Sequence, residues 1–156
     1  MLNRDPKNYR PNVCAVILDQ DGESVLLCHR VNFAIDEGWQ FPQGGYDPSL
    51  DLIAEMRREL REEVSTDAVE VLQISEIEYY YDFPTKIKKR FNNRYIGQRQ
   101  TWVLCQLVGS ENAINVNTEI PEFDQWIWVT PEEAIERVVD FKRKIYHDAL
   151  RELNQI

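Results

Sequence analysis

Residues 39–66 read WQFPQGGYDPSLDLIAEMRRELREEVST, and the character of the chain changes twice within them. A segment rich in aromatic residues leads into the pair Gly44-Gly45, which allows a turn that residues with side chains resist. The Asp-Pro-Ser at 47–49 then predicts a helix start, capped by its aspartate or its serine, because proline is tolerated in the first helical turn. The helix is expected to span residues 50–64.

The two faces of this predicted helix differ in chemistry. Apolar residues recur at spacings near three and four, as on one buried helix face, and they are Leu52, Ile53, Met56, Leu60 and Val64. Acidic residues recur at i+4 on the other face, at Asp51, Glu55, Glu59 and Glu63. Glu62 lies beside Glu59 at i+3, so three carboxylates fall within one helical turn.

Two interpretations of this acidic face are open from the spacing alone. Like charges at i+4 repel by a few tenths of a kcal/mol per pair, so the arrangement costs some stability unless cations occupy it. Divalent ions such as Mg2+ prefer oxygen ligands and sit between carboxylates and substrate phosphates. The alternative is a solvated helix face whose charge is balanced by Arg57, Arg58 and Arg61.

The glycine turn and the helix together resemble the Nudix box, Gly-x5-Glu-x7-Arg-Glu-(aliphatic)-x-Glu-Glu-x-Gly-(aliphatic). Counted from Gly44, the residues in register are Arg58, Glu59, Leu60, Glu62 and Glu63. The resemblance implies a hydrolase that binds Mg2+ or Mn2+, with more than one ion at the site. It also implies that the ions are held by Glu59, Glu62 and Glu63 together with the Gly44 carbonyl, and that Arg58 belongs to the catalytic machinery.

The chain departs from the box at three positions. Leu50 stands where the first glutamate belongs, Ser65 replaces the second glycine, and Thr66 takes the last aliphatic position. In the family the first glutamate supports the box through its arginine, so its loss is expected to loosen Arg58 and its neighbour. Asp51 is a partial substitute, although a shift of one residue turns a side chain about 100° aside on a helix. A catalytically weak nucleotide-binding module is therefore one alternative.

Five further segments resemble one subgroup of this family, the bacterial RNA pyrophosphohydrolases, also described as dinucleoside polyphosphate hydrolases. In chain order they are residues 9–13 (YRPNV), 39–45 (WQFPQGG), 97–100 (GQRQ), 121–124 (PEFD) and 141–144 (FKRK). The resemblance implies removal of pyrophosphate from the 5′-triphosphate end of RNA, leaving a 5′-monophosphate, as in mRNA decay. Hydrolysis of a dinucleoside polyphosphate such as diadenosine tetraphosphate is the alternative within the same chemistry.

The subgroup also assigns roles outside the box. Glu122 matches a glutamate that binds metal or acts as general base, and the sequence does not choose between it and Glu63 as the base. Phosphate contacts are implied for Arg10, Arg30 and Lys142, and a substrate contact for Arg99. Phe141 matches a residue that stacks on the first RNA bases; its alternative role is packing in the core.

Bulk properties limit the class of protein. The chain has 156 residues, of which 43% are hydrophobic and 29% charged, which predicts a single domain over 1–156 with a substantial core. It contains no apolar run of about 20 residues and no secretory signal at its start. Three widely spaced cysteines argue against a disulfide framework and against a zinc site, so we expect a cytoplasmic protein.

The net charge of −9 constrains the partner. Strong negative charge repels long nucleic acid, so we expect a protein that engages the 5′ end of RNA and neither DNA nor a membrane. Local positive charge comes from residues 86–99, from 142–144 and from Arg10 with Arg30, each of which is otherwise a solvated surface. A protein activator is compatible with the sequence but leaves no readable pattern in it.

The order of predicted elements favours an α/β fold. Strands are expected at 12–18, 24–29, 68–74, 76–83, 97–107 and 123–129, the first two forming a hairpin, and residues 85–95 read as a loop. Thr130 caps a second helical region that reaches about residue 153, with a break near Asp140. The resemblance implies the Nudix α/β/α sandwich, with a central mixed sheet, the box helix on one face and the C-terminal helix on the other.

Overall fold

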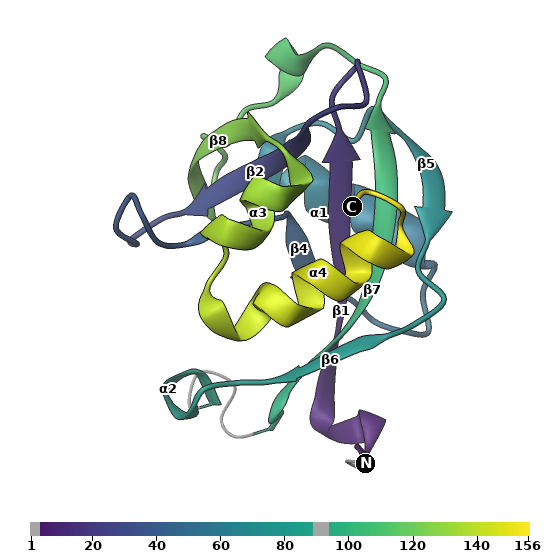
Figure 1. Ribbon diagram of the computed structural model, residues 1–156, viewed down its shortest axis with the longest axis vertical. Coiled ribbons are helices and arrows are strands. Elements are labelled where there is room, and N and C mark those ends of the chain that lie inside the picture. Colours follow the sequence, from purple (N-terminus) through teal and green to yellow (C-terminus); the bar gives the residue numbers. More distant parts are fainter. Residues whose placement is uncertain (1–3, 89–93) are drawn as a thin grey trace.

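The computed structural model describes residues 4–88 and 94–156, and an eight-stranded sheet occupies its centre (Figure 1). The strands are β1 (Tyr9–Leu18), β2 (Val25–Arg30), β3 (Trp39–Gln40), β4 (Gln43–Gly45), β5 (Val69–Ile74), β6 (Tyr79–Asp82), β7 (Gly97–Leu107) and β8 (Phe123–Val129). All six predicted strands are present, and the predicted hairpin is the antiparallel pair of β1 and β2. The additional short strands β3 and β4 flank Pro42.

The sheet is mixed, as predicted. Its main path runs β3-β2-β1-β7-β5, while β4 pairs with β1, β6 with β7 and β8 with β2. The strands β1 and β7 are parallel along their whole register, and the other pairs are antiparallel. Because β1 pairs with β2 at its end, at Leu18 and Val25, residues 12–14 of β1 are free to pair with β4, which contains Gly44 and Gly45.

Helices cover both faces of the sheet. One face carries α1 (Leu52–Val64), and the other carries α3 (Pro131–Arg137) and α4 (Arg143–Glu152) (Figure 1). A 3-10 turn at Asp140–Lys142 separates α3 from α4, which confirms the predicted break. Single turns also occur at Pro6–Asn8, at Glu111–Ala113 and in α2 (Thr85–Lys88), so the predicted loop at 85–95 begins with a helical turn.

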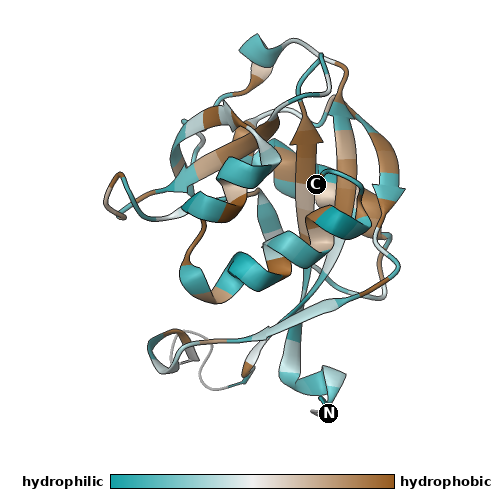
Figure 2. Cartoon of the chain, viewed as in Figure 1, coloured by the Kyte–Doolittle hydropathy of each residue, from teal (hydrophilic) through white to brown (hydrophobic). Residues whose placement is uncertain are grey.

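Alternation along β1 and β7 builds two cores, one on each side of the sheet. Cys14, Val16 and Trp102 pack with Tyr146 and Leu150 of α4. The residues between them, such as Val13, Ala15 and Val103, pack with Met56 and Leu60 of α1. Figure 2 shows the apolar strands between helices whose outer faces are hydrophilic.

The prediction for the start of α1 was wrong by a few residues. Asp51 is the N-cap, and its carboxylate accepts a hydrogen bond from the backbone N–H of Ala54 at 2.9 Å. Asp47 instead accepts hydrogen bonds from the backbone N–H and the hydroxyl of Ser49, which closes a separate turn ahead of the helix. Asp51 is therefore occupied as a cap and does not replace the missing box glutamate.

At the other end of α1, Ser65 adopts the left-handed conformation, with φ 69°. Glycine is the residue that takes this conformation at least cost. Here the serine hydroxyl donates a hydrogen bond to the Asn115 carbonyl at 2.7 Å, a contact that glycine lacks.

Across the described part of the chain, the helices are all too short or too polar to cross a membrane. Cys14, Cys28 and Cys105 are buried and form no disulfide.

Candidate active site

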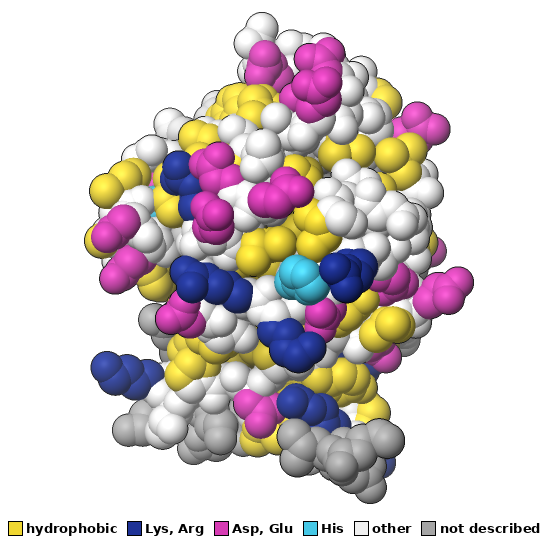
Figure 3. All heavy atoms as spheres, viewed as in Figure 1, with side chains coloured by type: hydrophobic (Ala, Val, Ile, Leu, Met, Phe, Trp, Pro, Cys, Tyr) yellow, Lys and Arg dark blue, Asp and Glu magenta, His cyan; other side chains and the backbone are white. Residues whose placement is uncertain are grey.

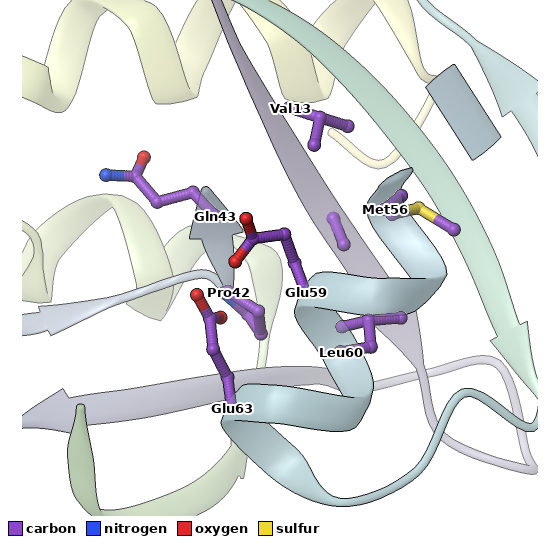
Figure 4. A pocket seen from close by; sticks show the side chains of 8 residues that line it. Val13, Pro42, Gln43, Met56, Glu59, Leu60 and Glu63 are labelled. Atoms are coloured by element: carbon purple, nitrogen blue, oxygen red, sulfur yellow. The ribbon is translucent and has the colours of Figure 1, made fainter. Parts of the chain in front are cut away.

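The glutamates of α1 that face the sheet lie against β4. Figure 4 shows the carboxylates of Glu59 and Glu63, one helical turn apart, pointing toward Pro42 and Gln43. Glu63 is 2% exposed, so it does not belong to a solvated face. The alternative interpretation of the acidic residues of α1, a solvated helix face, is therefore wrong for Glu63.

The predicted turn at Gly44-Gly45 is wrong, because both glycines lie in strand β4, but both are needed for close approach. A Cβ atom on Gly44 would lie 2.2 Å from the carboxyl carbon of Glu59, and one on Gly45 would lie 2.2 Å from a guanidinium nitrogen of Arg10. The absence of these side chains lets an acidic group and a basic group rest against consecutive residues. These two residues of β4 thus join the predicted metal side to the predicted phosphate side.

Glu122 completes the acidic cluster from the other side. It lies just before β8, where its backbone carbonyl accepts a hydrogen bond from the N–H of Val31 at 3.0 Å. Burial, followed by the charges of Glu122 and Glu59, raises the pKa of Glu63 well above its ordinary value. Burial also raises the pKa of Glu59, although the positive charge of Arg58 opposes that rise.

The strand that follows Glu122 is anchored by a buried histidine. Nδ1 of His29 lies 2.6 Å from a carboxylate oxygen of Asp124, and Nε2 lies 2.8 Å from the carbonyl oxygen of Ala34. The ring also packs on Trp39 at 5.1 Å between centroids. These contacts give His29 a structural role.

Glu62 lies away from this cluster. Its carboxylate side chain is 59% exposed, and both oxygens lie 3.2 Å from Nη1 of Arg58. The structure therefore brings Glu59, Glu63 and Glu122 together and leaves Glu62 at the rim, paired with Arg58.

The donor set suits a hard divalent cation. Among the described residues, neither oxygen of Glu63 receives a hydrogen bond, although both are buried. A buried carboxylate with no donor is costly, and a cation removes that cost. Glutamate oxygens beside a backbone carbonyl are the ligands that Mg2+ and Mn2+ prefer. No three His, Cys, Asp or Glu side chains in residues 4–88 and 94–156 are already arranged as a metal site, so the fit to the ion rests on the chemistry of these ligands.

A network of polar side chains that includes Arg10 lies on the α4 side of β1 and β7. Nη1 of Arg10 donates to the side-chain oxygen of Gln98 at 3.3 Å, and the Gln98 amide donates to the Tyr81 hydroxyl. Gln100 donates to Gln43 at 2.6 Å, which ties β7 to the first residue of β4. Sequence reasoning missed Tyr81, because its only signal was its place in an aromatic strand.

Lys142 and Phe141 meet this network from the 3-10 turn just ahead of α4. Lys142 is 7% exposed, and its ammonium lies 5.5 Å from the ring centroid of Tyr81. The Phe141 and Tyr81 rings lie 5.7 Å apart between centroids. Burial, and then the nearby charge of Arg30, lowers the pKa of Lys142 to about 8. Arg30 itself lies over the Phe33 ring at 5.0 Å.

Arg99 does not join this group. Successive strand residues point to opposite faces, so Arg99 lies on the face away from Gln98. Its guanidinium pairs with the Glu78 carboxylate at 2.9 Å.

The predicted basic segments also differ in their surroundings. Arg143 pairs with Asp140 and Lys144 with Asp148, each at 2.7 Å. Figure 3 shows the face over α3 and α4, where Lys and Arg side chains alternate with acidic ones. Of the segment at 86–99, residues 89–93 lie outside the described residues.

Comparison with known proteins assigns the family. The model of the NUDIX domain matches residues 8–149. The chain belongs to the Nudix family. This Nudix chain is 36% identical over 149 residues to the RNA pyrophosphohydrolase of Rickettsia peacockii (strain Rustic), covering 95% of this chain and 91% of the relative. It is 41% identical over 153 residues to the RNA pyrophosphohydrolase of Stenotrophomonas maltophilia (strain K279a), covering 96% and 72%.

Solved structures share the fold of this chain at low sequence identity. The E. coli dihydroneopterin triphosphate pyrophosphohydrolase has a TM-score of 0.65 at 18% identity, covering 91% of this chain and 97% of that one. A C. elegans Ap4A hydrolase binary complex has a TM-score of 0.64 at 18% identity, covering 94% and 99%. The predicted α/β/α sandwich and the predicted family are thus confirmed.

Proposed function

We propose that this chain is a divalent-metal-dependent hydrolase that removes pyrophosphate from the 5′-triphosphate end of RNA. The observation that carries the proposal is the buried Glu63 carboxylate, which has no donor among the described residues and lies near Glu122 and near Glu59, the residue that rests against Gly44. Relatives named RNA pyrophosphohydrolase, at 36% and 41% identity over nearly the whole chain, support the substrate.

Each acidic residue has a role in this proposal. Glu59, Glu63, Glu122 and the Gly44 carbonyl hold Mg2+ or Mn2+, and Glu62 joins them from the rim. When bound, the ions neutralise phosphate oxygens and lower the pKa of bound water. Either Glu63 or Glu122 accepts the proton of the attacking water, and no covalent intermediate is required. The products are 5′-monophosphorylated RNA and pyrophosphate or successive phosphates.

The polar network provides the substrate side. Arg10, which lies against Gly45, and Lys142 with Arg30 hold the phosphates. Phe141, braced by Tyr81, stacks on the first base, a contact worth about 1–3 kcal/mol. Arg99 is left out of the proposal because Glu78 holds it on the other face of β7. A cytoplasmic location suits the three unpaired cysteines.

Incubation of the protein and Mg2+ with two substrates in parallel tests the proposal. Triphosphorylated RNA should lose pyrophosphate faster than diadenosine tetraphosphate is cleaved into mononucleotides. The reverse preference would make the chain a dinucleoside polyphosphate hydrolase. Hydrolysis of neither substrate, over a range of metals, would point to a nucleotide-binding module.

Variants test the site itself. Replacing Glu62 and Glu63 by glutamine together should abolish turnover while the circular dichroism spectrum and thermal midpoint show a folded protein. Arg61→Gln is a matched control, because Arg61 lies on the same helix and its guanidinium pairs with Asp67 at 2.6 Å. Equal rates for the double variant and the control would contradict the assignment.

A further inference from the structure

The chain must hold Arg58 without the first glutamate of the box pattern. Leu50, which takes that position, is 55% exposed and lies outside α1. Asp51 is occupied by the backbone N–H of Ala54. Neither residue therefore supplies a carboxylate to Arg58 in this structure.

Glu55, which lies within α1, supplies a carboxylate to Arg58. It is 9% exposed, and one of its carboxylate oxygens accepts a hydrogen bond from Nε of Arg58 at 2.8 Å. The two lie three residues apart, a spacing at which helical side chains meet. Glu55 makes this contact from one turn before the carboxylates of the site.

The remaining edges of the Arg58 guanidinium face two of those carboxylates. Nη2 lies 3.1 Å from an oxygen of Glu59, and Nη1 lies 3.2 Å from both oxygens of Glu62. A guanidinium is planar, and its N–H groups point in fixed directions. The bond to Nε therefore sets where the other two nitrogens point.

Charge strengthens this geometric argument. One arginine lies among three carboxylates, and Glu55 is the one farthest from the Glu63 cluster along the helix. With Glu55 in place, part of the positive charge of Arg58 is balanced away from the site. Without that carboxylate, Arg58 would interact more strongly with Glu59 and Glu62 and compete with cations for them.

We propose that Glu55 is a positioning residue that replaces the first box glutamate of the pattern, holding Arg58 so that Glu59 and Glu62 are oriented for metal. This inference rests on the proposed function of the site. Under this inference, the carboxylate that is missing at Leu50 is supplied by Glu55, five residues further along the chain.

The experiment compares Glu55→Gln with Asp67→Asn in the full chain. Both changes remove one carboxylate that pairs with an arginine of α1, but Asp67 pairs with Arg61, away from the cluster. Mn2+ affinity, kcat and KM on triphosphorylated RNA, and the thermal midpoint without metal are measured for each. We expect Glu55→Gln to weaken Mn2+ binding about tenfold and to lower kcat, since partners behind metal ligands typically matter 10–100-fold. Asp67→Asn should leave Mn2+ affinity unchanged.

A double-variant cycle shows whether Glu55 acts through Arg58. Arg58→Lys supplies one point charge in place of the planar fork. If Glu55 acts through Arg58, adding Glu55→Gln to Arg58→Lys should cause no further loss of Mn2+ affinity.

Two results would overturn the inference. One is a Mn2+ affinity of Glu55→Gln equal to that of the wild type, with only the thermal midpoint lowered. The other is full additivity with Arg58→Lys. The proposed function is tested by a different result: it is contradicted if turnover is unaltered when Glu62 and Glu63 are both replaced.

Discussion

Two carboxylates of α1, four residues apart, have opposite surroundings. Glu59 has an arginine at 3.1 Å, whereas Glu63 is buried and has no donor among the described residues. The sequence predicted both as metal-site residues through the box pattern. It did not predict their difference in burial, because that difference depends on how closely β4 and the segment before β8 approach the helix.

Glu63→Gln should separate stability from activity. The amide removes a buried negative charge near Glu59 and Glu122, so the metal-free protein should melt at a higher temperature. The same change removes a proposed metal ligand, so the hydrolysis rate should fall at least about 100-fold. Thermal melts without metal and steady-state rates with Mg2+ provide the two readouts. A lower melting temperature would show that Glu63 has a stabilising partner in solution.

Lys142 should make substrate capture sensitive to alkaline pH. Its pKa, lowered to about 8 by burial and by Arg30, means that the ammonium loses its proton as pH rises through that value. The parameter kcat/KM on triphosphorylated RNA, which reports the free enzyme, should therefore decline above pH about 8. The Lys142→Arg variant keeps its positive charge at that pH, so its kcat/KM should decline only at higher pH. Identical profiles for the two proteins would contradict the prediction.

The elements of the chain were predictable to different degrees. The 3.6-residue pattern placed α1, and alternation placed the long strands, because both signals come from burial of one face. The exact helix start was missed, since three capping residues follow one another and Asp51 takes the cap. The short strands β3 and β4 were also missed, because their pairing depends on contacts far along the chain.

Restoring the box glutamate tests how α1 is organised. Since Glu55 already holds Arg58, Leu50→Glu alone should change kcat/KM by no more than about twofold. The measurement is steady-state hydrolysis beside the wild type, with the thermal midpoint as a check on folding. A large gain in rate would mean that Glu55 does not supply the missing carboxylate.

At the scale of the whole molecule, the sheet separates two cores, and contacts across its edges hold the layers in place. The His29 side chain joins β2 to β8 through Asp124 and to the loop before β3 through Ala34. Both contacted atoms are oxygens, so the doubly protonated imidazole satisfies them best. The sequence does not reveal these partners, because Asp124 lies 95 residues away along the chain.

Global stability should therefore depend on the charge of His29. Burial alone lowers the pKa of His29, but the hydrogen bonds to Ala34 and Asp124 outweigh it, so the pKa is raised. A raised folded-state pKa gives stability that is fully present below the unfolded value of about 6.5 and is lost as pH rises through the folded value. Denaturant unfolding should show the largest deficit for His29→Gln at acidic pH. His147→Gln, at the half-exposed second histidine, is the control, and a deficit independent of pH would refute the prediction.

The two adjacent glycines beside β1 have a consequence for how such a molecule can diversify. A single added methyl at one would press on the carboxyl group of Glu59, and at the other on the guanidinium of Arg10. Under the proposed function, hydrolysis and substrate binding therefore depend on neighbouring residues of β4, and each can be disturbed alone. Under the same proposal, a substitution at Gly45 changes which terminus is bound and leaves the hydrolytic chemistry in place.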